Sequence, residues 1–204
     1  MARTQQQRRE ATVARLLDAS IATIAEIGYA RASAKVITAR AGVSDGALFR
    51  HFDTMGDFMA ATAHEVARRQ LDLFTKRVAE IPADRAALEV ALTILADLTT
   101  NATNAVLYEL MIAARTDDKL RVTLRTVLDD YRAKIFDAAR ALPGADGFPA
   151  DLVPNLVALV TNSFDGAAIV EAVLPQPDLA AKRIPLLLSL LAAVPSSQLP
   201  YGFS

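Results

Sequence analysis

The chain has 204 residues and combines a high apolar content, 52%, with only 8 glycines, which favours helices over the turn-rich patterns of β proteins. It contains no cysteine, which excludes a disulfide framework, a cysteine-based zinc site and a thiol nucleophile. The net charge is −1, yet residues 1–52 carry eight basic and four acidic side chains, so a basic N-terminal part precedes an acidic remainder.

The first helix is predicted over residues 11–27, where apolar side chains recur at steps of three and four along one face. Gly28 can end this helix in a conformation that other residues avoid. A second helix is predicted over residues 33–41, where the Ser33 hydroxyl is placed to accept a hydrogen bond from the free amides of the first turn.

A third helix is predicted over residues 45–52, capped by Ser44, after a break of only a few residues. Two short helices with so tight a joint must cross at a steep angle, and Gly42 can take the left-handed conformation that such a turn requires. This is the helix-turn-helix arrangement. Its buried faces are predicted to hold Val36, Ile37, Val43, Leu48 and Phe52.

Six further helices complete the pattern, and Pro185 interrupts the last of them. Their predicted ranges are 54–80, 84–100, 101–115, 117–142, 151–174 and 178–194. We therefore expect an all-α fold of about nine helices, in which a three-helix head precedes a helical bundle.

The head also carries small and aromatic residues at fixed spacing, namely Gly28-Tyr29, Ser33, Ile37, Ala41-Gly42-Val43-Ser44, Gly46, Leu48-Phe49 and His51-Phe52. This pattern resembles the DNA-binding signature of the TetR family of transcriptional regulators. The resemblance covers roughly residues 11–60 and implies a homodimeric repressor that a small molecule releases from its operator DNA. It also implies a DNA-binding domain over residues 1–53 and a ligand-binding and dimerisation domain over residues 54–204.

The head departs from the family's usual pattern at four positions. Ala32 and Thr38 stand where the pattern has Thr and Ala, and Phe49 replaces the more frequent Tyr. Met55 occupies a position at which many members have a phosphate-binding lysine. Because two phosphate contacts are missing, other basic groups are expected to carry part of the backbone contact, among them the N-terminal Arg3, Arg8 and Arg9.

If the third helix enters the major groove, its exposed face must approach base edges closely and read them. Arg50 is the best candidate for reading a guanine edge, with a phosphate contact as the open alternative. His51 is expected to contact a phosphate, because no metal-ligand or catalytic spacing surrounds it. The predicted DNA-binding residues are Arg31, Ser33, Lys35, Ser44, Asp45, Gly46, Ala47, Phe49, Arg50 and His51.

Residues 152–174 are apolar on more than one face, which requires either a central core position or a partner subunit. The resemblance implies the second, a four-helix bundle that brings two heads to successive major grooves. The predicted interface residues are Leu156, Leu159, Val160, Phe164, Ala167, Ile184, Leu187, Leu188 and Leu191.

The resemblance further implies that the helices between head and interface enclose a pocket for the effector. The pattern there is mostly apolar, so a lipophilic or aromatic effector is expected, with no cofactor and no metal. The predicted lining residues are Phe74, Leu98, Asn101, Tyr108, Met111, Ile112, Arg115, Tyr131, Asn162 and Asp165.

Two alternative functions are an enzyme or ligand carrier and a regulator of another kind. An all-helical enzyme or ligand carrier is disfavoured, because the chain has only 2 histidines and no nucleophile-elbow or phosphate-loop motif. An activator stays open, since activation and repression differ in where the operator lies relative to a promoter, and so does a regulator that has no ligand and responds to a protein partner. No apolar run reaches the roughly 20 uninterrupted residues of a membrane span, and no signal-peptide segment is present, so we expect a soluble cytoplasmic protein.

Overall fold

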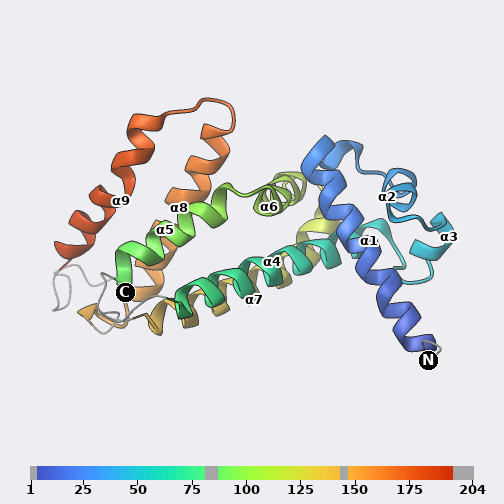
Figure 1. Ribbon diagram of the computed structural model, residues 1–204, viewed down its shortest axis with the longest axis horizontal. Helices are drawn as coiled ribbons and strands as arrows, with labels where there is room; N and C mark the ends of the chain where they lie inside the picture. The colour runs from blue at the N-terminus through green and yellow to red at the C-terminus, as the bar shows by residue number, and fades with distance from the viewer. Residues whose placement is uncertain (1–3, 81–86, 143–146, 195–204) are drawn as a thin grey trace. The chain divides into compact units, whose positions relative to one another are not determined.

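The computed structural model describes residues 4–80, 87–142 and 147–194, and over these ranges it consists of helices and turns without strands (Figure 1). The predicted all-α fold is confirmed. A 3-10 turn at Tyr29–Arg31 follows the first helix. The helices are α1 Gln5–Ile27, α2 Ala34–Ala41, α3 Asp45–Leu48, α4 Met55–Ala79, α5 Ala87–Thr100, α6 Ala102–Ala113, α7 Asp118–Arg140, α8 Val153–Glu171 and α9 Pro177–Ala192.

The chain divides into two compact units. Unit one consists of Met1–Gln70 and Asn101–Tyr131, and unit two of Leu71–Thr100 and Arg132–Ser204. The helices α4 and α7 therefore contribute residues to both units. The predicted division into residues 1–53 and 54–204 concerns function and stays a prediction, since unit one holds the predicted head together with later residues.

The first helix begins six residues earlier than its apolar periodicity predicted. Thr4 accepts a hydrogen bond from the Gln7 amide at 3.2 Å, and the Gln7 side chain accepts one from the Thr4 amide at 2.9 Å. This capping box starts a helical turn in a polar stretch that has no apolar face.

The helix-turn-helix forms as predicted in α2, and differs in α3. Ser33 caps α2, since its hydroxyl accepts from the Val36 amide at 3.4 Å, and Gly42 takes the left-handed conformation with φ 64°. The α-helical part of α3 ends at Leu48 and continues as turns, so the predicted range to residue 52 is too long. Ser44 holds the N-cap position in an extended conformation without a side-chain cap, which corrects that prediction.

The core of unit one joins the head to α4 and α6. Leu16, Ile37, Leu48 and Phe58 are all fully buried in one cluster, and Val43 and Phe52 pack against it. The prediction for Val36 is wrong, because this side chain is 40% exposed in the first turn of α2. The side chains on the opposite face of the head, Val36 among them, are therefore not buried in this core.

The core of unit two includes several residues of the predicted dimer interface. Val160, Phe164 and Leu191 are buried within the single chain, where they form a cluster with Leu92 of α5. Within the single chain these three side chains therefore serve the core, and their predicted place in a dimer interface stays a prediction. The predicted residues Leu156, Ile184, Leu187 and Leu188 are partly buried against the same cluster, Ala167 is half-buried, and Leu159 is 65% exposed.

By length and composition, α8 is the one single helix in the described ranges that could cross a membrane, with a mean hydropathy of 1.3 over its most apolar window. The sequence-based expectation was that no segment would qualify, because Asp165 interrupts this run. Glu171 at the end of α8 pairs with Arg183 of α9 at 2.6 Å, and both side chains are 22% exposed. An ion pair between two helices and an exposed Asn162 fit a surface that faces water and protein.

In unit one, four charged side chains link α1 to α4. Glu65 accepts hydrogen bonds from Arg68 and Arg69 at 2.7–2.8 Å, and Arg69 also pairs with Asp18 of α1. The hydrogen bond from Arg68 is the largest cause that lowers the pKa of Glu65 to about 2, against the opposing effect of burial. The charged form of Glu65 is therefore favoured in the folded chain.

Replacement of this carboxylate, Glu65→Gln, is expected to lower the free energy of unfolding by about 1–2 kcal/mol at neutral pH, a value reduced for the solvent-exposed arginines. Because the folded pKa lies below the unfolded one, the stabilisation is present above about pH 4.5 and is lost as the pH falls toward about 2. Urea denaturation of both proteins over this range measures the difference. Glu89→Gln, at an exposed glutamate of α5, is the control, and a Glu65→Gln difference that does not shrink in acid would contradict the argument.

Candidate nucleic-acid interface and cavity

The predicted DNA-binding residues lie on the surface of unit one. Arg31, Ser33, Lys35, Ser44, Asp45, Gly46, Phe49 and Arg50 are exposed, and Ala47 and His51 are half-buried. They come from the 3-10 turn, the start of α2, and α3 with the turns that follow it. The buried Ile37 and Leu48 on the opposite faces of α2 and α3 hold this surface in place.

Two polar contacts set the orientation of side chains at α3. The Thr38 hydroxyl of α2 donates a hydrogen bond to Asp45 and to the Ala34 carbonyl, at 2.8 Å for the latter. Thr38, one of the departures from the family pattern, thus ties α2 to α3. The Arg50 Nε donates to the Gly46 carbonyl at 3.2 Å, which uses one of the five N–H donors of the guanidinium group.

Positive charge gathers beside His51. Burial is the largest cause that lowers the pKa of His51, followed by the charges of Arg9 on α1 and Arg50. Its Nδ1 is buried and has no hydrogen-bond partner among the described residues. Arg9, Arg50 and a neutral His51 therefore form a corner in which an anionic oxygen would be electrostatically favoured.

The structure also places three of the departures from the family pattern. Ala32 is buried at 6% exposure, and Met55 at the start of α4 is half-buried against the core of unit one. Phe49 is 47% exposed and brings no hydroxyl to the surface. The first two therefore serve packing, whereas Phe49 presents an apolar ring at the candidate interface.

Two hydrogen-bonded links within unit one connect α6 to its neighbours, one to the end of α1 in the head and one to α4. The Tyr29 amide, just after α1, donates to a Glu109 carboxylate oxygen of α6 at 3.0 Å. The side-chain amides of Gln70 and Asn101 exchange two hydrogen bonds of 3.0 Å each, which join α4 to the N-cap of α6. Displacement of α6 would therefore act on both the end of α1 and the middle of α4.

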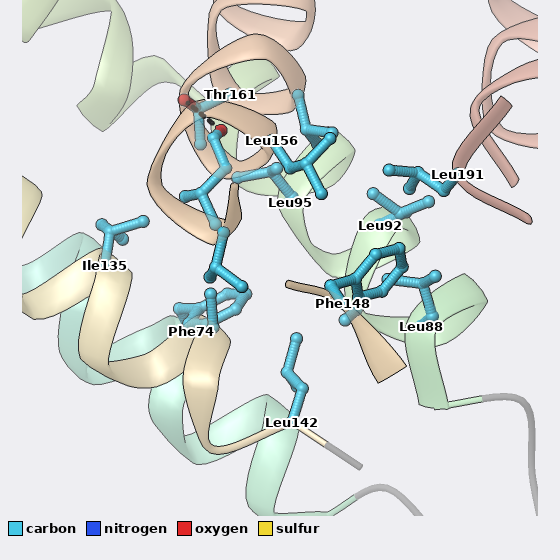
Figure 2. Close-up of a pocket in the computed structure, with 15 residues that line it drawn as sticks. Phe74, Leu88, Leu92, Leu95, Ile135, Leu142, Phe148, Leu156, Thr161 and Leu191 are labelled. Atoms are coloured by element: carbon cyan, nitrogen blue, oxygen red, sulfur yellow. Dashed lines mark hydrogen bonds between the residues drawn. The ribbon is translucent and has the colours of Figure 1, made fainter. Parts of the chain in front are cut away.

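Unit two contains a cavity of about 310 Å³ between α4, α5, α7 and α8. Figure 2 shows Phe74 and Phe148 with aliphatic side chains around this space and Thr161 at its margin. Among the described residues of the lining, Thr161 is the one polar residue, so this part of the wall is almost entirely hydrocarbon. The lining residues are Phe74, Leu88, Ala91, Leu92, Leu95, Ile135, Ala139, Leu142, Phe148, Val153, Leu156, Val157, Val160, Thr161 and Leu191.

Of the ten predicted effector contacts, the structure brings Phe74 alone to the wall of this cavity. Leu98 is buried beside Phe74 in a separate cluster, and Asn162 is exposed on α8 while Asp165 is half-buried. The remaining predictions fall in unit one: Asn101, Tyr108, Met111, Ile112, Arg115 and Tyr131. Of these, Tyr108 is buried at 7% exposure and Ile112 is 56% exposed.

Sequence reasoning missed the other lining residues for a physical reason. Apart from Phe148 and Thr161, they are leucines, valines, alanines and one isoleucine, whose spacing equals that of ordinary core residues. A cavity arises where facing helices leave space between such residues, which periodicity does not encode. The one available signal was the pair of aromatic residues, Phe74 and Phe148, in segments otherwise built from aliphatic residues.

The described residues offer no site for a metal ion. No group of three or more His, Asp or Glu residues within the described parts of the chain is placed to hold a metal ion. Two candidate sites follow from the described residues. One is the exposed, locally basic surface in unit one, and the other is the apolar cavity in unit two.

The amino-acid sequence is similar to those of transcriptional regulators. Residues 16–62 match the family model described as "Bacterial regulatory proteins, tetR family". An HTH-type transcriptional regulator of Mycobacterium tuberculosis is 73% identical over 193 residues, covering 95% of this chain and 99% of that protein. The HTH-type transcriptional regulator CymR of Pseudomonas putida is 25% identical over 167 residues, covering 82% of each chain.

Solved structures share the fold. The multidrug binding protein EbrR, crystallised with imidazole, superimposes with a TM-score of 0.67 at 20% identity, covering 94% of this chain and 98% of its own. The regulator FadR from Bacillus subtilis, in complex with stearoyl-CoA, gives a TM-score of 0.65 at 19% identity, covering 88% and 97%. At these identities the likeness concerns the fold.

Proposed function

Because the chain belongs to the TetR family of transcriptional regulators, we propose that it is a homodimeric repressor which an apolar effector releases from its operator. The family consists of regulators that bind DNA through a helix-turn-helix, and its members are not enzymes. The observation that carries the proposal is the combination of an exposed, locally basic α3 surface with an apolar cavity in the same chain.

The DNA-reading role rests on the surface of α3. Arg50 and Ala47 stand where a helix in the major groove meets base edges, and Gly46 lets the backbone approach closely. Arg31, Lys35 and the corner at His51 supply phosphate contacts that fix the register. Two such heads on a dimer reach half-sites about 34–36 Å apart, so the operator is expected to be approximately palindromic.

The dimer rests on apolar surface that α8 and α9 leave exposed. Leu159 is 65% exposed, Val173 after α8 is 88%, and Leu186 and Leu190 of α9 are 59% and 57%. Large aliphatic side chains gathered at this exposure mark an interaction surface in a protein of this size. A symmetric four-helix bundle would bury them, with Val160, Phe164 and Leu191 supporting it from inside each chain.

A charge placed in this surface, Leu190→Asp, is expected to raise the dimer dissociation constant by roughly 100-fold or more, because each copy must bury an unpaired carboxylate. Analytical ultracentrifugation at micromolar concentration measures the change. Val122→Asp, at a 70% exposed valine of α7 in unit one, is the control and is expected to leave the dimer intact. If the Leu190→Asp protein stays dimeric, the dimer interface must lie on another surface of the protein.

The effector role rests on the cavity and on the helix that links it to the head. Phe74 of α4 lines the cavity, and residues 55–70 of the same helix pack in unit one. We infer that a bound effector favours a conformation in which the two heads no longer fit both grooves, with α4 and the Glu109 and Gln70 links transmitting the change. Release requires that the effector prefer this conformation by a few kcal/mol.

Selection from a random pool of DNA duplexes tests the proposal directly. The native protein is expected to enrich a sequence with two related half-sites about one helical turn apart, and to repress a reporter placed behind it. Enrichment of such a site together with reporter activation would instead support the activator alternative. The proposed location is the cytoplasm, where the DNA is.

A further inference from the structure

The lining of the cavity in unit two bears on the chemical class of the effector, an inference that rests on the function proposed above. Thr161 is the one polar residue in the part of the lining that the structure describes. Its hydroxyl donates within α8, shared between the Val157 carbonyl at 2.9 Å and the Ala158 carbonyl at 3.2 Å. Its donor is therefore already used. No charged residue lines the cavity over the described ranges of the chain.

Two ion pairs link charged side chains of the helices in this unit. Arg77 of α4 binds Asp97 of α5 at 2.8 Å, and Arg183 of α9 binds Glu171 of α8 at 2.6 Å. None of these four residues belongs to the lining. A ligand carboxylate inside the cavity would meet neither a counter-ion nor a free hydrogen-bond donor from the described lining, a situation that disfavours the charged form strongly.

Size and shape narrow the class further. An apolar cavity of about 150 Å³ in a protein core stays dry and takes up benzene, so a cavity of about 310 Å³ suits about ten to twelve carbon atoms. Phe74 and Phe148 offer their rings to the cavity, and aromatic ligands pack against such rings edge-to-face or offset (Figure 2). The volume of the cavity and its two aromatic side chains favour a ligand that consists of an aromatic ring with a short alkyl chain.

We propose that the effector is an uncharged hydrocarbon of about ten to twelve carbon atoms, such as an alkylbenzene, and that the cavity rejects a carboxylate of the same shape. A carboxyl group that lies fully inside the cavity must therefore enter as its neutral acid. With an acid pKa of about 4, roughly one molecule in a thousand is protonated at pH 7, so its affinity is expected to be about 1000-fold weaker there.

Isothermal titration calorimetry with butylbenzene and 4-butylbenzoate tests this on the native protein. The affinity for butylbenzene is expected to be the same at about pH 5.5, 6.5 and 7.5, whereas that for 4-butylbenzoate falls about tenfold for each unit. The proposal is overturned if 4-butylbenzoate binds as tightly as butylbenzene at the highest pH, if its affinity does not change with pH, or if butylbenzene does not bind.

A matched pair of variants locates the site. Val157 is half-buried and lines the cavity, so Val157→Trp fills the space and is expected to weaken butylbenzene binding at least tenfold, roughly the effect of one unfavourable packing contact. Thr93→Trp makes the same addition on the exposed face of α5 and is expected to leave binding unchanged. Unchanged binding in a folded Val157→Trp protein places the ligand elsewhere and overturns the proposal.

Operator binding, measured on the same samples, separates this inference from the proposed function. A native protein that binds its operator but not butylbenzene refutes the effector class alone. A protein that binds butylbenzene with the expected pH pattern but no operator refutes the regulator and leaves the hydrocarbon site standing.

Discussion

Arg50→Ala is expected to weaken binding to the selected operator by about 30-fold to 10,000-fold, the largest effect of any single change to the DNA surface. A bidentate contact between arginine and guanine contributes about 1–3 kcal/mol of discrimination, and a dimer makes it twice. The same substitution is expected to weaken binding to a scrambled duplex far less. Fluorescence anisotropy with both duplexes, at one salt concentration, measures the two affinities.

The affinity for the scrambled duplex distinguishes a guanine contact of Arg50 from a phosphate contact. If Arg50 contacts only phosphate, both affinities fall by the same factor and the ratio between the duplexes stays constant. Arg125→Ala is the control, because this arginine of α7 in unit one is 83% exposed and lies 4.0 Å from its partner Asp129. If Arg50→Ala binds the operator as tightly as the native protein, Arg50 does not contact the operator.

Phe58→Ala is expected to lower the free energy of unfolding by about 3–5 kcal/mol, the cost of leaving a cavity where a large ring was packed. Phe58 is fully buried at the start of α4, and its ring lies 4.9 Å from that of Phe52, which follows α3. Loss of this ring removes the support beneath the helix-turn-helix, so operator binding is expected to weaken as well. Urea denaturation at fixed protein concentration measures the stability.

Phe49→Ala is the matched control for stability, since the same deletion at a ring that is 47% exposed is expected to change the free energy of unfolding by less than about 1 kcal/mol. Comparable losses in the two variants would contradict the assignment of Phe58 to the core. A small loss at Phe58 with intact operator binding would mean that the head does not depend on this contact.

The sequence was informative where local chemistry decides the structure. The positions of Ser33, Gly28 and Gly42 follow from cap and turn geometry, and each is confirmed by its hydrogen bond or its backbone angle. The start of α1 was missed, because the capping box of Thr4 and Gln7 lies in a polar segment without periodicity. The end of α3 was missed, because a helical apolar pattern also fits the turns after Leu48.

The candidate sites were predictable to different degrees. The residues of the DNA surface are local in sequence, so spacing and resemblance place them together, and the structure leaves them exposed or half-exposed. The cavity depends on how α4, α5, α7 and α8 leave space between aliphatic side chains, which one-dimensional patterns do not contain. Val160 and Phe164 show the same limit, since periodicity marks them as apolar without saying whether a partner or their own chain covers them.

Titration of the native protein with the intergenic DNA beside its own gene, at several salt concentrations, tests whether the protein is an operator-binding regulator. Selective binding over a scrambled duplex is expected, with the logarithm of affinity falling linearly with the logarithm of salt at a slope of about −0.9 for each phosphate contacted. If the protein binds that DNA and a selected pool no more tightly than scrambled duplex, it is not an operator-binding regulator, and the hydrocarbon cavity becomes the starting point for another function.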